Sequence, residues 1–256
     1  MVLSSGKKPG SLFSIKRKTF DGIPVSRYNC YQLVGISVTP TETILESRHE
    51  SKTRFLDAAV HVIRAKGYSA TRIEDVCEVA GLTKGSFFHH FESKEALALD
   101  AADYWIEGSE ALFASAPYRD HADPLDRLLA YVDFRKALLT GDLPDFTCLA
   151  GTMVQEVYDT HPALREVCNR TITGHAGILI PDIEEAVRQR GMRPKWTAES
   201  LALYTQATIQ GAFVLAKAAH GAEVAVQCID HLRRYIVLLF HQPQATSKKT
   251  NALRKS

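Results

Sequence analysis

From residue 51 onward, apolar side chains recur at the spacing of α-helices. Within residues 51–66, five apolar residues stand at i, i+3, i+4, i+7 and i+8 and form one stripe: Phe55, Ala58, Ala59, Val62 and Ile63. Gly67 follows, and glycine commonly ends a helix in the left-handed conformation. Strand-like alternation bounded by turn residues is missing from the sequence. The pattern therefore predicts an all-α protein.

Two short helices separated by a tight turn are predicted next. Thr71 and Glu74 have the spacing of a capping box, which indicates a helix that runs to Val79. Gly81 breaks this helix, and Thr83 caps another from Lys84 to about residue 91. Four apolar residues are expected to lock the two helices together: Ile73, Val76, Val79 and Leu82. This arrangement is typical of a helix-turn-helix.

Longer helices are predicted in the rest of the chain. Ser93 caps a fourth helix that continues without a breaker through Tyr104. Further helices are expected at about 124–140, 147–159, 162–190, 197–220 and 223–241, between breaks that contain glycine or proline. We therefore expect a three-helix DNA-binding domain at 48–93, joined to a larger helical effector-binding and dimerisation domain at 94–241.

The two ends of the chain have a different composition. Residues 1–47 mix glycine, proline, serine and threonine with lysine and arginine and show no helical period. We interpret this segment as a disordered basic extension or a start codon assigned too early; a basic arm that adds non-specific DNA affinity is the alternative. Residues 242–256 are predicted to be a flexible tail.

Composition limits the class of protein. The net charge is +2 and 45% of the residues are apolar, as in an ordinary globular protein. No apolar run reaches the ~18–20 residues that span a bilayer, and no signal peptide is evident, so we expect a cytoplasmic protein without membrane contact. The cysteines Cys30, Cys77, Cys148, Cys168 and Cys228 are odd in number and never form CxxC, which argues against disulfides and structural zinc. The sequence contains no GxSxG, HExxH, Walker or dinucleotide motif, so we expect no enzymatic activity and no cofactor.

Two stretches of the helix-turn-helix region carry a specific resemblance. Ala65-Lys-Gly-Tyr-Ser-Ala-Thr-Arg-Ile-Glu-Asp-Val76 and Ala80-Gly-Leu-Thr-Lys-Gly-Ser-Phe-Phe-His-His-Phe-Glu-Ser-Lys-Glu-Ala-Leu97 resemble the TetR family of repressors. The resemblance implies a regulator that dimerises on a double-stranded DNA operator and is released by a small-molecule effector. An activator of the same family, and a redox or electrophile sensor acting through Cys148, remain alternatives.

The resemblance also implies which residues contact DNA. Thr71 would contact a phosphate, with Arg72 near the DNA backbone, and His90 and Lys94 would reach further phosphates. Thr83, Lys84 and Ser86 would face the major groove, where Gly85 would let the helix approach closely. Phe88 stands where the family usually has a tyrosine, so one phosphate contact is lost; whether His89 compensates is open. His89 and His90 do not form a metal pair, because adjacent helical residues point ~100° apart.

The second half of the chain is expected to dimerise and to sense. The last two helices combine small and large apolar residues, which favours a four-helix bundle with a second copy. Aromatic residues of the middle helices, some of them plain core, suit a pocket for an apolar or amphipathic ligand. The candidates are Tyr104, Trp105, Tyr131, Phe134, Leu138, Phe146, Cys148, Met153, Tyr158, His175, Ile178 and Phe213. We interpret Cys148 as a buried apolar side chain, since no lysine or arginine lies near it in sequence.

Overall fold

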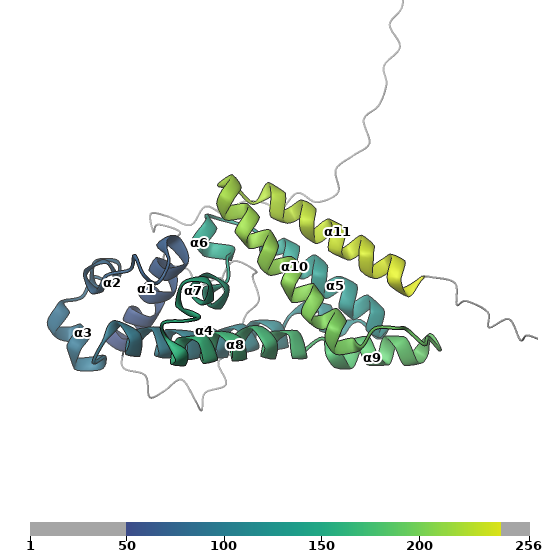
Figure 1. Ribbon diagram of the computed structural model, residues 1–256, viewed down its shortest axis with the longest axis horizontal. Helices are drawn as coiled ribbons and strands as arrows, with labels where there is room; N and C mark the ends of the chain where they lie inside the picture. The colour runs from purple at the N-terminus through teal and green to yellow at the C-terminus, as the bar shows by residue number, and fades with distance from the viewer. Residues whose placement is uncertain (1–49, 242–256) are drawn as a thin grey trace, which may run out of the picture.

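The computed structural model describes residues 50–241, and all regular secondary structure in this part of the chain is helical (Figure 1). The prediction of an all-α protein is confirmed. The predictions made for residues 1–47 and 242–256 lie outside the described residues.

The helices follow one another with short connections. The first four are α1 (Glu50–Lys66), α2 (Ile73–Ala80), α3 (Lys84–His90) and α4 (Lys94–Ala114). A 3₁₀ turn, η2 (Pro117–Asp120), leads to α5 (Pro124–Ala137), α6 (Leu143–Phe146), α7 (Leu149–Val157), α8 (Pro162–Gly177), α9 (Ile180–Gln189), α10 (Ala198–Ala219) and α11 (Glu223–Phe240). Gly67 and Gly81 end α1 and α2 at φ values of +88° and +63°, as their positions in the pattern predicted.

Two predicted helices differ from those in the structure. The helix expected at 162–190 is divided into α8 and α9, and Pro181 lies in the first turn of α9, where the missing N–H is tolerated. Pro144 has the same role in α6, a short helix that precedes the one expected at 147–159. Proline thus begins a helix at both places, although the sequence pattern indicates a break only at Pro144.

The core consists of two clusters that α4 connects. One cluster joins α1, α2, α3 and the first half of α4 to α7 and the start of α8. The other joins the end of α4 to α5, α9, α10, α11 and the end of α8. Helices α4 and α8 run side by side along the long axis of the molecule (Figure 1). The core cluster of the first three helices thus also includes residues beyond position 93, because α7 packs on α1 and α4.

Candidate functional site

The turn between α2 and α3 is held by backbone and side-chain hydrogen bonds. Gly81 has left-handed angles (φ 63°, ψ 37°), and its N–H donates to the carbonyl of Glu78 at 3.1 Å. Arg54 of α1 donates from Nη2 to the carbonyl of Ala80 at 2.6 Å. A guanidinium at the carboxyl end of a helix satisfies its last carbonyls and favours its dipole. Sequence reasoning missed this role of Arg54, which depends on the crossing of α1 and α2.

Helix α3 presents one polar face and buries the other. The N–H of Ser86 donates to Thr83 Oγ1 at 3.2 Å, so the predicted N-cap is confirmed. Phe87 and Phe91 are buried against Phe55, with ring centroids 5.6 and 6.0 Å from it, which confirms the prediction that they are core residues. Four residues on the opposite face are exposed: Lys84, Gly85, Phe88 and His89. Phe88, at 56% exposure, therefore lies open to solvent.

Three cations near this face are paired with carboxylates: Lys66, Arg72 and Lys84. Lys84 forms an ion pair with Glu74, and hydrogen bonding to Lys84 lowers the pKa of Glu74. Asp75 accepts hydrogen bonds from Arg72 at 3.0 Å and from Lys66 at 2.5 Å, and these cations hold the pKa of its carboxyl well below the usual range. DNA phosphates would compete with these carboxylates for the same cations.

Three residues predicted near phosphates make contacts within the protein. Thr71 does not cap α2: its side chain is 1% exposed, Oγ1 donates to the carbonyl of Gly67 at 2.6 Å, and Arg72 is the N-cap instead. Lys94 Nζ donates to the carbonyls of Tyr68 and Thr71 at 3.0 and 3.1 Å, which leaves one of its three donors. His90 Nε2 lies 2.7 Å from the Ser51 hydroxyl.

Thr71 therefore orders the α1–α2 loop from inside, because its hydroxyl is already hydrogen-bonded to the carbonyl of Gly67 in the protein without DNA.

A second correction concerns Val79, which was expected to lock α2 against α3. Val79 is 54% exposed, since α2 turns this position away from α3.

A cavity of about 530 Å³ lies between the ends of α1 and α4 and helices α5, α6, α8 and α10. Seven of the predicted pocket residues line it: Trp105, Leu138, Phe146, Cys148, His175, Ile178 and Phe213. Its volume falls within the ~300–1,000 Å³ of known ligand pockets.

Five predicted pocket residues lie elsewhere. Met153 is fully buried in the core cluster of the first helices, whereas Tyr158 is on the surface at 61% exposure. Phe134 packs on Phe113 and Tyr118, with ring centroids 5.5 and 5.8 Å away. Tyr131 is buried behind the cavity wall.

The fifth, Tyr104, donates to Asp57 at 2.8 Å, on the side of α4 that faces α1. Burial raises the pKa of Asp57, and this hydrogen bond opposes the rise. These positions depend on the rotation of each helix about its axis, which residue type does not reveal.

A chain of hydrogen bonds runs behind the cavity wall. Gln206 of α10 donates from Nε2 to the Tyr131 hydroxyl at 3.0 Å, and this hydroxyl lies 3.0 Å from His175 Nε2. Arg135 Nη1 also approaches His175 Nε2, at 3.0 Å. Burial, together with the positive charge of Arg135, lowers the pKa of His175 to about 3. His175 is therefore neutral near pH 7, and its Nε2 accepts from the guanidinium.

Arg64 is a wall residue that the sequence did not indicate. This side chain is 6% exposed, and Nε donates to the carbonyl of Thr147 at 2.5 Å. Its guanidinium carbon lies 4.6 Å from the ring centroid of Trp105. Arg64 belongs to the last turn of α1, so it connects the first helix to the cavity.

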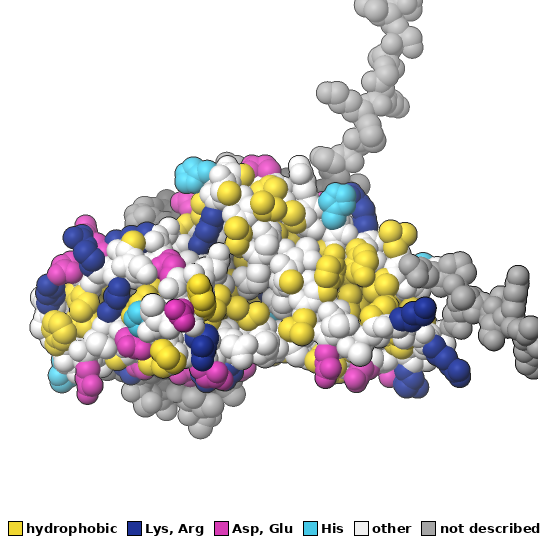
Figure 2. All heavy atoms as spheres, in the orientation of Figure 1, with side chains coloured by type: hydrophobic (Ala, Val, Ile, Leu, Met, Phe, Trp, Pro, Cys, Tyr) yellow, Lys and Arg dark blue, Asp and Glu magenta, His cyan; other side chains and the backbone are white. Residues whose placement is uncertain are grey.

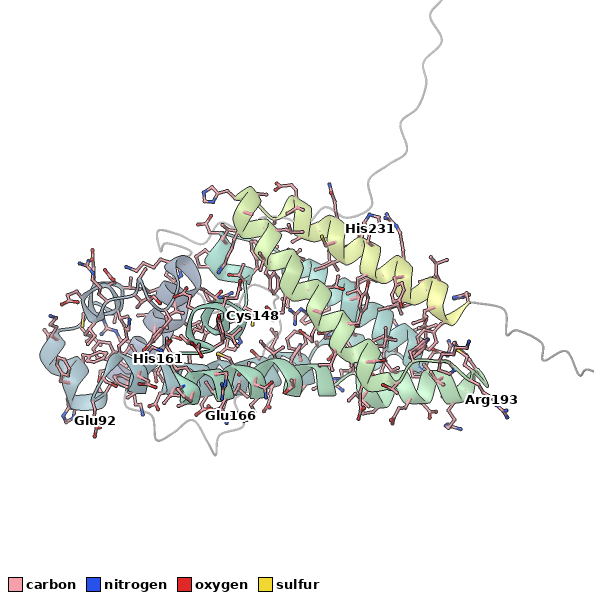
Figure 3. All side chains as sticks on the ribbon, in the orientation of Figure 1. Glu92, Cys148, His161, Glu166, Arg193 and His231 are labelled. Atoms are coloured by element: carbon pink, nitrogen blue, oxygen red, sulfur yellow. The ribbon has the colours of Figure 1, made fainter. Side chains whose placement is uncertain are left out.

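Cys148 lies at the centre of the molecule, beside α7 (Figure 3). Its Sγ accepts the N–H of Gly151 at 3.4 Å, at the start of α7. Burial is the main cause that lowers the pKa of Lys217 of α10, Arg64 lowers it further, and Cys148 raises it. No lysine or arginine lies near Cys148 in the sequence, as expected. The fold, however, brings Lys217 close enough for Cys148 to influence the pKa of the lysine.

The outer faces of α10 and α11 carry exposed apolar side chains. Figure 2 shows hydrophobic side chains gathered over the area that these helices occupy in Figure 1. The large ones are Leu203, Tyr204, Val214, Leu215, Tyr235 and Leu238, and we call them the α10–α11 face. The rings of Tyr204 and Tyr235 lie 5.0 Å apart and join the two helices. A contiguous apolar face of this kind indicates an interaction surface.

Neither a metal-binding cluster nor a membrane-spanning helix occurs in the part of the chain that the structure describes. Within residues 50–241, no group of three or more histidine, cysteine, aspartate or glutamate side chains is arranged to hold a metal ion. In the same part of the chain, no helix has the length and hydrophobicity needed to cross a membrane.

Comparison with known proteins gives two matching family models. Residues 55–101 match the model of bacterial regulatory proteins of the tetR family. Residues 124–232 match the tetracyclin repressor-like C-terminal domain. The first match covers the helix-turn-helix, and the second covers α5 through α10 and the first half of α11.

Individual relatives agree with these models. The HTH-type transcriptional regulator CymR of Pseudomonas putida is 33% identical over 135 residues, which are 51% of this chain and 62% of CymR. YerO of Bacillus subtilis (strain 168), another HTH-type regulator, is 40% identical over 58 residues, 23% of this chain and 20% of YerO. The chain thus spans less than two thirds of these curated relatives. A crystal structure of a TetR transcriptional regulator from Chloroflexus aurantiacus J-10-FL superimposes with a TM-score of 0.65 at 31% identity, covering 73% of this chain and 94% of that one.

Proposed function

This chain belongs to the TetR family of DNA-binding transcriptional regulators, a non-enzymatic family, and we propose that it is a repressor which dimerises on its operator and is released by a small-molecule effector. The observation that carries the proposal is the combination, in one chain, of an exposed face on α3, an apolar α10–α11 face and a cavity that touches both core clusters.

We place the DNA interface on the exposed face of α3. Lys84, Ser86 and Thr83 stand at the start of this helix, where side chains of a recognition helix reach base edges. Arg72, His90 and Lys94 lie around it as candidate phosphate contacts. His89, exposed beside Phe88, is the candidate to replace the contact that a tyrosine hydroxyl would make.

Base contacts and phosphate contacts are separable by mutation. Ser86→Ala should change which operator bases are preferred, because Ser86 is assigned to the groove. Lys94→Ala should weaken binding to all DNA sequences about equally, because a phosphate contact carries no sequence information. Binding to a library of randomised operators measures both. A changed preference in Lys94→Ala would mean that the two assignments are wrong.

We place the dimer interface on the α10–α11 face. The exposed apolar residues of α10 recur every three or four positions, from Leu203 through Val214, with Ala207 and Gly211 between them. Small residues let two helices approach closely, and two helices from each copy form a four-helix bundle. The regular apolar spacing supports a second copy as the occupant of this face, since an isologous contact needs one self-complementary patch.

The dimer prediction has a direct test. Leu203→Glu together with Val214→Glu places two buried charges per copy in the interface and should give a monomer by light scattering at micromolar concentration. Tyr158→Glu is the control: it changes an exposed aromatic residue far from this face, and the variant should remain dimeric. Leu138→Glu would not serve as a control, because it alters the cavity. A wild-type monomer at the same concentration would refute the four-helix bundle.

Release requires that the cavity communicate with α3. Helix α4 offers a direct route: Trp105 and Phe113 line the cavity, and Lys94 at its first residue holds the loop before α2 through Tyr68 and Thr71. A shift of α4 would move this loop and thereby the helix-turn-helix. An effector that favours one position of α4 would then change the distance between the two recognition helices of a dimer.

The experiment that tests the proposed function is selection of genomic DNA fragments by the purified protein, followed by footprinting. A bound site of two half-sites that overlaps a promoter supports a dimeric repressor. A site placed upstream of the promoter, with transcription raised by the protein, would favour an activator and overturn the proposal.

A second candidate, sensing through Cys148, is favoured by one observation. The Cys148 thiol lines the cavity, where a small molecule that enters it would meet the sulfur. If Cys148→Ser releases DNA with oxidants or electrophiles as the wild type does, this candidate is eliminated.

A further inference from the structure

Arg135 brings a guanidinium to the cavity without a carboxylate partner. Within residues 50–241 no aspartate or glutamate forms an ion pair with it, and its contacts are to uncharged groups. Nη1 donates to His175 Nε2 at 3.0 Å, and the guanidinium carbon lies 5.3 and 5.8 Å from the ring centroids of Phe113 and Phe213. Arg135 is partly buried, and removing a charge from water is costly unless a partner compensates it.

The other arginines of the wall already have partners of their own. Arg170 pairs with Asp103 at 2.7 Å. Arg64 donates to the carbonyl of Thr147, and Arg119, which is exposed, donates to the carbonyl of Phe113 at 3.2 Å. Arg64 and Arg119 thus donate hydrogen bonds to backbone carbonyls, whereas Arg135 donates to a side chain, His175, that a ligand can displace.

The carboxylates of the wall do not neutralise Arg135 either. Asp145 accepts the backbone N–H of Asp142 at 2.8 Å, at the start of α6, and Glu110 is exposed on α4. His175 contributes no second positive charge near pH 7, because burial lowers its pKa to about 3. Arg135 therefore offers the cavity a positive charge that no side chain within residues 50–241 neutralises, and an anionic group of a ligand would complement it.

The remaining surface of the cavity is largely apolar. Trp105 and Ile106 of α4, Phe146 of α6, Phe213 of α10 and Ile178 at the end of α8 form walls around the guanidinium. The planar fork of arginine binds a carboxylate through two parallel hydrogen bonds. A molecule with one carboxylate and an apolar body satisfies both parts of the cavity.

We propose that the effector is a small organic monocarboxylic acid whose carboxylate binds Arg135 and whose apolar body packs against Trp105, Phe146 and Phe213. This inference rests on the proposed function in that it assigns a chemical class to its effector. The His175–Tyr131–Gln206 chain orients Arg135 and ends on α10, so a ligand that draws the guanidinium from His175 perturbs a helix of the proposed dimer interface.

The test compares acids with their own neutral analogues on the full-length protein. Phenylacetate, cinnamate and octanoate are each titrated by calorimetry beside the corresponding primary amide, with phenyl phosphate as the dianionic probe. At least one acid should bind, and its amide should bind about 10- to 100-fold more weakly, because the charge-assisted hydrogen bonds are lost. Equal binding of acid and amide, preference for phenyl phosphate, or no binding of any acid would overturn the proposal.

Two variants locate the binding residue. Arg135→Gln should lose the preference for acid over amide, while Arg119→Gln, which removes an exposed arginine of the same wall, should keep it. Retention of the acid preference in Arg135→Gln would also refute the assignment. Because the comparison of acid with amide uses the wild type, it stands even if Arg135→Gln fails to fold.

DNA binding is measured separately, by fluorescence anisotropy on the selected fragments. Failure of the wild type to bind any DNA would refute the proposed function and leave the acid-binding result intact. If the protein binds DNA and no acid binds the protein, the monocarboxylate inference alone fails.

Discussion

Gly85 is the residue at which the requirements of folding and of DNA binding are expected to be opposed. It lies in the first turn of α3, exposed, with ordinary right-handed angles. A Cβ added there would meet only Thr83 Oγ1, at 3.7 Å, which is ordinary van der Waals contact. Alanine in a helix is more stable than glycine by roughly 0.5–1 kcal/mol, so Gly85→Ala should leave the free energy of unfolding unchanged or raise it by up to that amount.

The same methyl group should weaken DNA binding. If α3 approaches the major groove closely at Gly85, the added carbon meets DNA atoms, and overpacking of this kind costs about 1–3 kcal/mol at each site. A dimer carries two such sites. The least expected loss is therefore about 2 kcal/mol, and since about 1.4 kcal/mol corresponds to a factor of ten, the operator affinity should fall at least about 30-fold in Gly85→Ala.

Chemical denaturation and fluorescence anisotropy on the same samples measure the two effects. Gly177→Ala is the matched control, because Gly177 is a helical glycine of α8, far from α3 and outside the cavity lining, and a Cβ added to it would meet no atom within 4 Å. It should gain stability in the same way and bind the operator like the wild type. Wild-type affinity in Gly85→Ala would refute close approach at this position, and a loss of stability would refute the local geometry.

Two further predictions concern charges. Glu74→Gln should raise operator affinity about two- to fivefold, since it frees Lys84 from its ion pair and removes a negative charge beside the DNA; weaker binding by anisotropy would instead mean that Glu74 orients Lys84. His175 has a folded pKa of about 3, below its ordinary value of 6.5, so its contribution to stability is complete above pH 6.5 and is lost as the pH falls toward 3. Urea denaturation at several pH values measures this loss. As the pH falls, the free energy of unfolding of the wild type should decrease by at most about 1.4 kcal/mol per pH unit more than that of His175→Gln. The same pH dependence in both proteins would contradict the burial of a neutral histidine.

Local sequence was enough to predict the helix-turn-helix. The cap of α3 at Thr83, the turn at Gly81 and the buried Phe87 depend on residues within a few positions of one another, so their pattern carries the structure. Thr71 was the exception, because its hydroxyl bonds back to Gly67 and Arg72 takes the capping position.

The cavity wall was only partly predictable, because it depends on how distant helices cross. Trp105 and Met153 are both large apolar residues of the middle helices, and nothing in their local sequence distinguishes them. Trp105 lines the cavity, whereas Met153 packs in the core cluster of the first helices, because α7 joins that cluster. The same holds for Arg135: its lack of a carboxylate partner is a property of three packed helices and not of any motif.

Arg64 shows how this packing changes the interpretation of charge. In the sequence it is one of the basic residues of the DNA-binding segment, and it adds to the cations available for phosphates. In the structure its guanidinium is buried between Thr147 and Trp105, so it contributes little to the field that DNA meets. It instead fixes the end of α1 to the cavity wall. A ligand in the cavity would therefore contact the DNA-binding helices directly at Arg64, as well as through α4, and both contacts would act on the same three helices.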